Sequence, residues 1–257
     1  MQRTGTTSVQ MALGYLGLNA YHGRSLWWHP EHTNHWLALL NRRRFNKKRT
    51  EFLDQFDAIA GDFPAFPLWR QLCAQWPDAK VLLTVRDPEE WVESFQETIV
   101  TRYLDGPVDK ALPSENLRGL AYALMWGPGA VFSDHSREGL LRAFEAHNRE
   151  VQETIPRDRL LVMDVKDGWG RLAEHVGMET PDLPFPALYA RNEFHTTETT
   201  YWQLWVKGEA SMSGVGWGKN LEEACMDYAS RNPEWAADFD RDRLLHGGQL
   251  ITSERPS

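Results

Sequence analysis

Short apolar runs alternate with amphipathic stretches along most of the chain. Three near-continuous apolar runs stand out, at residues 56–60, 80–85 (KVLLTV) and 159–165 (RLLVMDV). Parallel strands that are covered on both faces have this composition, because neither face meets water. We therefore expect three buried strands, each followed by a helix.

Apolar residues at three- and four-residue spacing fill the segments between these runs, as on one face of an α-helix. In the longest segment, Leu140, Phe144 and Val151 share a face, and Pro156 ends the pattern. The segments predicted to be helical are 66–76, 88–103, 115–126, 136–155 and 168–177. Alternating strands and helices predict an α/β fold with a parallel central sheet and helices on both faces.

The first eight residues, MQRTGTTS, contain a short run of Gly and hydroxyl residues that opens a further amphipathic helix. Val9, Leu13 and Leu16 share its apolar face, and Gly17 stands at its predicted C-cap. The backbone N–H groups of residues 5–8 would then point toward one spot at the start of the helix. The helix dipole adds partial positive charge at that spot, so the sequence predicts an anion site there.

The residues around this turn refine the predicted anion. Arg3 adds a permanent charge that can donate to two oxygens of one phosphate or sulfate group. An ordinary ATPase or GTPase is disfavoured, because no lysine follows Gly5 and no glycine stands five residues before it. The alternative interpretation of the turn is a threonine-rich helix cap without a ligand.

A second candidate site lies in residues 80–95, KVLLTVRDPEEWVESF. Arg86 follows the predicted strand at its carboxyl end, where ligands bind in open parallel sheets. Ser94 lies about two helical turns further on. The alternative is that Arg86 pairs with an acidic neighbour among residues 87–90 and that Ser94 is solvated.

Composition narrows the function classes. The chain of 257 residues has ordinary globular content, and its formal net charge of −8 disfavours a general nucleic-acid binder. Cys73 and Cys225 are too far apart for a disulfide framework or a zinc site. His29, His32 and His35 are interpreted as polar surface, because no thiol or carboxylate completes a ligand set. Without a long apolar stretch or a signal peptide, we expect a soluble, cytoplasmic protein.

Taken together, these features resemble the P-loop sulfotransferases, in particular a subfamily found among bacterial, fungal and invertebrate proteins. The resemblance covers residues 2–195 and implies a three-layer P-loop fold. The segments that carry it are RTGTTSVQMAL at 3–13, YH at 21–22, GDFPAFPLW at 61–69, the stretch 86–94, DVKDGW at 164–169 and PFP at 184–186.

The resemblance implies a cosubstrate, 3′-phosphoadenosine-5′-phosphosulfate (PAPS), whose sulfuryl group passes to a hydroxyl or amine. Its 5′-phosphosulfate would be held by Arg3, Thr4, Gly5, Thr6, Thr7 and Ser8. Its 3′-phosphate would be held by Arg86 and Ser94. No metal is implied, because sulfuryl transfer places little net charge on the migrating group. Trp169 is assigned a place near the adenine, with a core position as the alternative.

An acceptor hydroxyl needs a base, and two residues are candidates for that role. Asp62 follows the predicted strand 56–60 and matches the acidic position of the family's Asp-x-Pro pattern. His22 follows the first helix, matches a family position and titrates near neutral pH. For Asp62 the alternative is a helix cap near Ala65 or an Asx turn.

Two departures from the family pattern are notable. The family has an apolar strand before the arginine of the loop, whereas this chain starts at Met1, two residues before Arg3. We therefore expect a sequence truncated upstream, which lacks the first strand of the sheet. The usual continuation after the PFP segment is replaced by residues 187–189 (ALY), so no role is carried over there.

Residues 1–204 are predicted to form the sulfotransferase-like domain, and residues 205–257 a C-terminal appendage. In the appendage, 211–218 (SMSGVGWG) predicts a loop without a nucleotide, and 219–230 predicts a helix. A basic run at 42–49 is interpreted as a solvated helix end. Its alternatives are a patch for an anionic acceptor or a nuclear address.

The sequence therefore predicts a PAPS-dependent sulfotransferase that acts on a small-molecule or glycan acceptor. We expect no nucleic-acid or membrane partner, and a homodimer is compatible with the pattern. One alternative is a nucleotide-dependent kinase of P-loop fold, which would require Mg²⁺ and ATP. The other is a catalytically inactive binding protein of the same fold.

Overall fold

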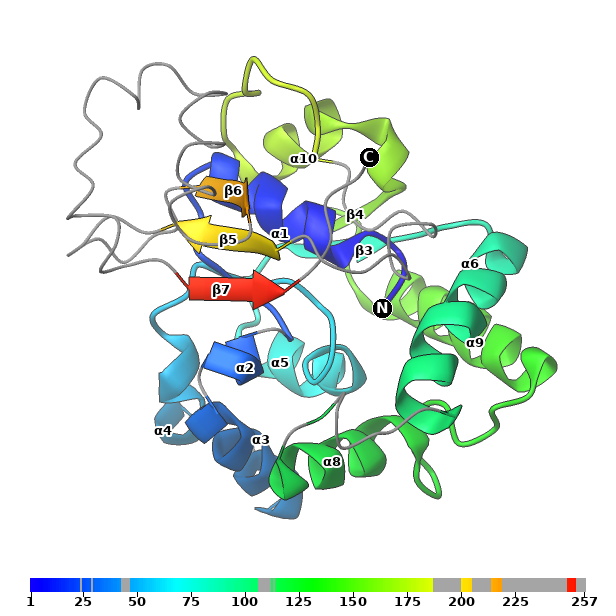
Figure 1. Cartoon of the computed structure of the whole chain (residues 1–257). Helices are drawn as coiled ribbons and strands as arrows, with labels where there is room; N and C mark the ends of the chain where they lie inside the picture. Colours follow the sequence, from blue (N-terminus) through cyan, green and yellow to red (C-terminus); the bar gives the residue numbers. More distant parts are fainter. Residues whose placement is uncertain are drawn as a thin grey trace.

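The fold is α/β, with helices around short strands (Figure 1). The computed structural model describes residues 1–23, 25–28, 30–42, 47–105, 112, 114–186, 200–204, 214–218 and 249–252. Within these residues, no helix has the length and apolar character needed to cross a membrane.

The structure contains two parallel strand pairs, and three of their four strands lie in the predicted regions. β1 (Ala20–Tyr21) pairs with β2 (Ala58–Ile59), and β3 (Val81–Thr84) pairs with β4 (Leu160–Met163) in register from Val81 to Thr84. The strands predicted at 56–60, 80–85 and 159–165 are thus confirmed as β2, β3 and β4. Among the described residues the two pairs do not join into one sheet.

The side chains of β3 and β4 explain why helices cover both faces of this pair. Leu161 and Met163 belong to a hydrophobic cluster with α1 (Thr6–Tyr15) and α10 (Trp169–Val176). Leu83 packs in a second cluster with residues of α9 (Arg137–Thr154) and α5 (Trp69–Gln75). Because successive side chains of a strand point to opposite faces, this pair is buried on both sides, as its composition predicts.

Helix α1 follows the prediction at both of its ends. It begins after Gly5 and ends near Gly17, which has a φ of 81°. The Leu18 amide donates to the Leu13 carbonyl at 2.9 Å across the glycine, a closure that requires the left-handed conformation at Gly17.

The five segments predicted as helical between the strands are confirmed with some subdivision. They are η2 (Phe66–Leu68) with α5, α6 (Pro88–Phe95) continued by the π-helical η3 (Gln96–Asp105), α8 (Glu115–Ala121) with η4 (Tyr122–Trp126), α9, and α10. Side-chain caps define the starts of several helices. The Asp87 carboxylate accepts the Glu90 amide of α6 at 2.9 Å, and the Ser136 hydroxyl accepts the Gly139 amide of α9 at 3.0 Å.

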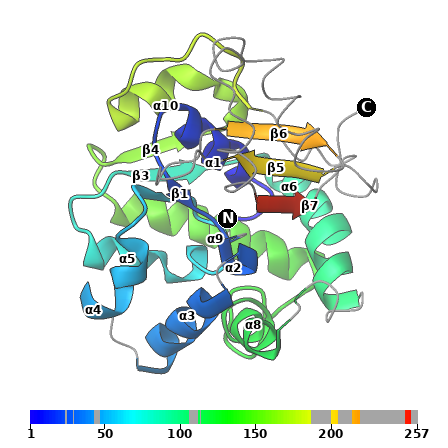
Figure 2. The same ribbon diagram turned by 60° about the vertical axis from the view of Figure 1, so that its left-hand side comes forward.

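Further elements lie between β1 and β2, a region for which no complete helix or strand was predicted. They are α2 (Ser25–Trp28), α3 (Pro30–Arg42), α4 (Lys47–Thr50) and η1 (Glu51–Leu53). A last short turn, η5 (Val165–Asp167), follows β4 directly. Figure 2 shows α3 and α8 side by side below the strands.

The larger core is aromatic and lies among α3, α6, α8 and α9. Its fully buried side chains include Trp36, Trp91, Phe95, Phe132 and Phe144. The Trp91 ring stacks on Phe144, with centroids 4.3 Å apart and planes 14° apart, and this stacking fixes α6 against α9.

The C-terminal part of the chain contains an antiparallel sheet. β5 (Thr200–Leu204) pairs with β6 (Gly214–Gly218) on one edge and with β7 (Gln249–Thr252) on the other. The loop predicted at 211–218 is therefore wrong for residues 214–218. Pairing with β5 outweighs the weak strand preference of the three glycines. The helix predicted at 219–230 lies outside the described residues, as do residues 187–189.

Replacing Trp91 with Phe tests how the N-terminal segment is fixed. The Trp91 indole donates to the Gln2 carbonyl at 2.9 Å, and Phe keeps an aromatic ring but leaves that carbonyl without its donor. We expect the free energy of unfolding to fall by about 1–3 kcal/mol, measured by urea denaturation. As a control, Trp126→Phe changes a half-buried indole of the same core and should cost less. Equal losses would contradict a contribution from the Gln2 hydrogen bond.

Candidate functional site

The first five residues form a loop that is fixed to the carboxyl end of β3. The Thr4 hydroxyl donates to the Met1 carbonyl at 2.7 Å, so the Thr84 hydroxyl donates to Thr4 in their 2.6 Å hydrogen bond. Thr84 is the last residue of β3, and Thr4 is buried. The loop therefore lies at the sheet edge where open parallel sheets bind ligands.

Gly5 makes the turn from this loop into α1. It stands at the N-cap with a φ of 86°, and no side chain caps the helix. A Cβ at this position would lie 2.5 Å from Cγ1 of Val165 in η5, so the backbone approaches η5 too closely for a side chain. The threonine-rich cap considered as the alternative is not formed. The first-turn amides of α1 therefore remain oriented as an anion site requires.

Arg3, Arg86 and Ser94 lie together beside this loop. The Arg3 Nε donates to the Ser94 hydroxyl at 2.9 Å, and Arg86 Nη1 donates to the Arg3 carbonyl at 3.4 Å. Ser94 is fully buried, so its solvated alternative is wrong. The structure thus brings together residues that are more than eighty positions apart in sequence.

Arg86 also makes the ion pair that the alternative interpretation expected. Its Nε lies 3.3 Å from Glu90 Oε2, one helical turn along α6. Lys166 of η5 approaches the same oxygen, with its Nζ at 3.8 Å. Sequence reasoning did not single out Lys166. The feature of the sequence that could have identified Lys166 is its place in the DVKDGW segment, directly after β4 and at the same sheet edge.

An open pocket of about 420 Å³ borders Arg86. It lies between the start of α6 and the surface of α9. Its lining is mixed in polarity and comprises Arg86, Pro88, Phe144, Glu145, Asn148, Arg149, Gln152 and Glu153. The Arg86 side chain is 26% exposed, so its guanidinium is accessible as well as fixed to the loop.

Asp62 and His22 meet because they follow two paired parallel strands. His22 comes directly after β1, and Asp62 follows β2 by three residues. His22 Nε2 lies 3.5 Å from Asp62 Oδ2, and the His22 ring is buried. The other carboxylate oxygen, Oδ1, accepts the Phe63 amide at 2.6 Å. This bond to the next residue is not the Asx turn expected as an alternative, because Pro64 has no N–H group to donate, and no side chain caps η2.

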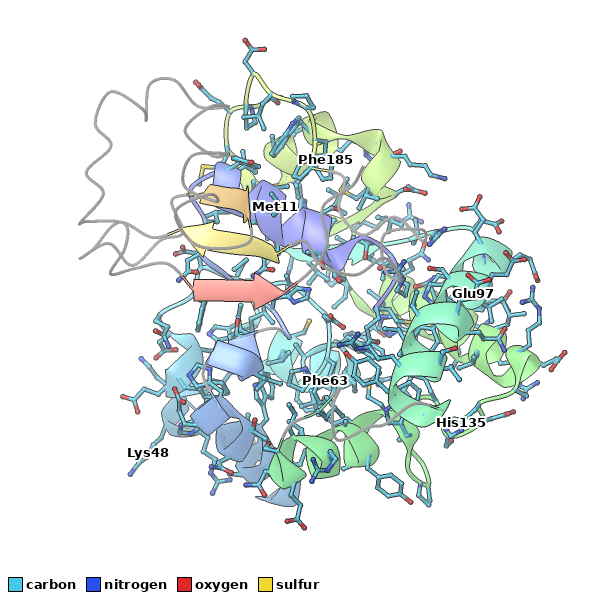
Figure 3. All side chains as sticks on the ribbon, in the orientation of Figure 1. Met11, Lys48, Phe63, Glu97, His135 and Phe185 are labelled. Atoms are coloured by element: carbon cyan, nitrogen blue, oxygen red, sulfur yellow. The ribbon has the colours of Figure 1, made fainter. Side chains whose placement is uncertain are left out.

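This pair lies next to the loop of residues 1–5, which precedes the predicted anion site and is called the anion loop below. The amino group of Met1 donates to the Gly61 carbonyl at 3.2 Å, immediately before Asp62. Figure 3 shows Phe63, the residue after Asp62, near the centre of the molecule. A buried imidazole beside a carboxylate can accept a proton, because the carboxylate stabilises the imidazolium that forms.

Trp169 takes the core position that was its alternative. It is buried, its indole donates to the Leu183 carbonyl at 2.6 Å, and its ring packs edge-on against Tyr15 and Phe185. It belongs to the cluster that joins α10 to α1. Its contribution is therefore to fix α10 against the helix that begins at Gly5.

The predicted surface position of the histidine trio is wrong for His32. Its side chain is buried and packs against Phe52, with ring centroids 4.9 Å apart. His35 is exposed, and its ring stacks on the same Phe52, with ring centroids 4.9 Å apart. His29 lies outside the described residues. Within the described part of the chain, no group of three His, Cys, Asp or Glu residues is arranged to hold a metal ion.

The basic run contributes an outer surface. Lys47 and Lys48 are exposed on α4, and Figure 3 shows Lys48 at the periphery of the molecule, far from Phe63. This position agrees with the solvated helix end that the sequence predicts. Residues 43–46 lie outside the described residues.

Comparison with known proteins shows which family the chain resembles. Residues 1–194 match the family model described as "Sulfotransferase domain". The chain is also similar to "Ava biosynthesis cluster protein M" of Aspergillus versicolor, at 29% identity over 235 residues, which are 83% of this chain and 90% of that protein. The family match includes the anion loop, the segment from Arg86 to Ser94 and the His22–Asp62 pair.

Two glycine substitutions separate backbone strain from the close contact at the loop. Gly5 and Gly17 both have φ above 80°, but a Cβ at Gly17 would meet nothing within 4 Å. We expect Gly17→Ala to lower the free energy of unfolding by about 1–2 kcal/mol. Gly5→Ala should cost about 1–3 kcal/mol more, because its methyl group overlaps Val165. Urea denaturation measures both losses.

The contact with Val165 supplies the control for this prediction. Adding Val165→Ala to Gly5→Ala removes the overlapping methyl groups. Gly5→Ala should therefore cost less free energy of unfolding in the Val165→Ala background than in the wild-type protein. Equal destabilisation by the two glycine substitutions would show that the approach of η5 does not constrain the loop.

Proposed function

Because the chain belongs to the sulfotransferase domain family, we propose that it transfers a sulfuryl group from PAPS to a hydroxyl or amine of an acceptor. The observation that carries the proposal is the convergence of the α1 N-terminus, Arg3, Arg86 and Ser94 at the carboxyl end of β3. Two ends of one nucleotide can be held by such an arrangement, since PAPS carries anionic groups at both its 5′ and 3′ positions.

The chemistry of the donor set fits this cosubstrate. Backbone amides at a helix N-terminus and a guanidinium are good ligands for tetrahedral anions. In the proposed site, residues 5–8 and Arg3 bind the 5′-phosphosulfate. Arg86 and Ser94 bind the 3′-phosphate, the group that distinguishes PAPS from ATP. When bound, PAPS supplies the sulfuryl group.

The loop also acts on the transition state. As the sulfuryl group moves, negative charge grows on the departing phosphate oxygen. The α1 amides and Arg3 are held in place before reaction by the hydrogen bonds of Thr4 and Ser94. Donors fixed in this way stabilise developing charge without reorganisation, and removing one typically costs about a hundredfold to a thousandfold in rate.

The proton of the acceptor passes to the His22–Asp62 pair in this proposal. Asp62 is the proposed base, because it follows β2 at the edge that holds the anion loop, and its carboxylate is partly exposed. His22 supports it from the buried side. Its Nε2, 3.5 Å from Asp62 Oδ2, can donate to the carboxylate or share the proton.

The name of the similar fungal protein refines the acceptor class. That protein is named for a biosynthesis cluster. This favours a small molecule over a glycan as the acceptor of the present chain. The acceptor is therefore to be sought among phenols, alcohols and amines of small metabolites.

Replacing Arg86 with Ala tests the proposed donor site. We expect binding of adenosine 3′,5′-bisphosphate to weaken by about tenfold to a hundredfold, because a charged hydrogen bond to the 3′-phosphate is lost. Binding of adenosine 5′-phosphate should change little, because its 3′ position carries a hydroxyl and no phosphate. Isothermal titration calorimetry of both nucleotides measures the difference.

The same titrations contain the outcomes that contradict the proposal. Equal losses for the two nucleotides would remove Arg86 from the 3′-phosphate site. If the wild-type protein binds ATP only with Mg²⁺ and does not bind the bisphosphate, a kinase is favoured. Failure to bind either nucleotide favours an inactive binding protein.

Replacing Asp62 with Asn tests the proposed base. Asn keeps an oxygen for the Phe63 amide and removes the negative charge beside His22. We expect turnover to fall by about a hundredfold to ten-thousandfold, with the affinity for adenosine 3′,5′-bisphosphate unchanged. The assay follows release of the bisphosphate from PAPS with the fastest acceptor of a panel of phenols, alcohols and amines.

The matched variant for this experiment is His22→Gln. A similar loss in His22→Gln would show that the two residues act as a pair, and a much smaller loss would leave Asp62 as the base. Unchanged turnover in Asp62→Asn would rule out the carboxylate as the proton acceptor.

A further inference from the structure

We propose that Glu90 is an exchangeable counter-ion of the donor site, which competes with the 3′-phosphate for Arg86 and for a further cation, Lys166. This inference rests on the proposed function and adds two residues to it. Glu90 would hold the two cations until a dianionic group replaces its carboxylate. Lys166 would then share the 3′-phosphate with Arg86.

One carboxylate oxygen serves both cations. Arg86 Nε lies 3.3 Å from Glu90 Oε2, and Lys166 Nζ lies 3.8 Å from the same atom. One carboxylate oxygen therefore faces two cations, and two cations attract a group of higher negative charge.

The backbone of Lys166 is held against the anion loop. Its neighbour Val165 occupies the space into which a Cβ of Gly5 would project. The turn η5 is closed by reciprocal hydrogen bonds, in which the Lys166 amide donates to Asp164 at 3.0 Å and the Asp164 amide donates to Asp167 at 3.2 Å. The Lys166 amine therefore extends from a fixed position between Gly5 and Glu90.

The exposure of the three side chains allows exchange. Arg86, Glu90 and Lys166 are 26%, 51% and 72% exposed, so none of the pairs is enclosed by the core. Exposed pairs are weak, since water competes for both partners. A phosphate monoester carries nearly two negative charges at neutral pH and offers three oxygens, so it can accept from both cations where the carboxylate offers them one oxygen.

The exchange has a direct consequence for nucleotide preference. Adenosine 5′-phosphate has no group that displaces Glu90. Its affinity should therefore be insensitive to the Glu90 charge. Adenosine 3′,5′-bisphosphate must displace the carboxylate, so the Glu90 charge lowers its affinity.

Removing the charge of Glu90 tests the inference. We expect Glu90→Gln to tighten binding of adenosine 3′,5′-bisphosphate by about twofold to fivefold at low ionic strength and to leave adenosine 5′-phosphate unchanged. Lys166→Met should weaken binding of the bisphosphate by a similar factor. Isothermal titration calorimetry measures the affinity of the wild-type protein and of each variant for both nucleotides, and circular dichroism verifies that each variant is folded.

Neighbouring charges provide matched controls. Glu89→Gln removes the same charge one residue away, but Glu89 pairs with Arg137 of α9 instead of Arg86. Arg171→Met removes an exposed cation that pairs with Asp167, 3.5 Å away. Neither control should change the preference between the two nucleotides.

The outcomes distinguish this inference from the proposed function. If wild-type protein binds the bisphosphate but Glu90→Gln and Glu89→Gln have equal effects, or Lys166→Met has none, the exchange is overturned and the donor site stands. If adenosine 5′-phosphate gains as much affinity as the bisphosphate in Glu90→Gln, the effect is one of overall charge and the exchange is also overturned. If the folded wild-type protein does not bind the bisphosphate, the proposed function itself fails.

Discussion

The hydrogen bond between Thr4 and Thr84 ties the anion loop to the sheet, and the remaining geometry of the site depends on it. Arg3, the next residue toward the N-terminus, has a φ of 64°, a conformation that costs a non-glycine residue about 1–2 kcal/mol. The loop keeps this conformation because its flanks are fixed. Thr4 is held by β3, and the Gln2 carbonyl is held by the Trp91 indole at 2.9 Å. The strain is thus stored where the Arg3 side chain and carbonyl reach Ser94 and Arg86.

A short sheet is sufficient to place the proposed base. β1 and β2 are two residues long each, yet their parallel pairing aligns Ala20 with Ala58 and Tyr21 with Ile59. The residues that follow both strands are therefore delivered to the same edge. Close packing completes the alignment, since a Cβ at Gly23 would lie 2.1 Å from the Phe63 carbonyl oxygen. The contact between His22 and Asp62 follows from this register.

Much of the fold, including the turn at Gly5 into α1, was predictable from the sequence, for local physical reasons. Strands β2, β3 and β4 are apolar runs, and the helices have clear periodicity and caps, as at Ser136 and Asp87. Elements that depend on distant partners were not predictable. β1 is too short to show a period, β6 is stabilised by pairing despite its glycines, and the burial of His32 depends on Phe52 from another segment.

Among the site residues, too, local features could be predicted and contacts with distant partners could not. Arg3 and Gly5 lie two positions apart in the first turn, so their proposed roles could be predicted together. The contacts of Arg86 could not, because a guanidinium at a strand end can reach either a ligand or a neighbouring carboxylate. Lys166 was not predicted, because a single lysine in a polar turn forms no recognisable motif. Its proximity to Glu90 arises only when β4 pairs with β3.

Three residues of helix α6 make contacts with three different parts of the molecule. Glu90 meets the cations, Trp91 enters the aromatic core and Ser94 receives Arg3. A shift of α6 along its axis, or a rotation about it, would disturb the packing of the core and the proposed nucleotide site together. Diversifying α6 in a directed-evolution library would therefore yield mostly misfolded variants. Tyr21 of β1 and Phe63 belong to the same core cluster as Trp91, so the β1–β2 edge is coupled to this helix through packing.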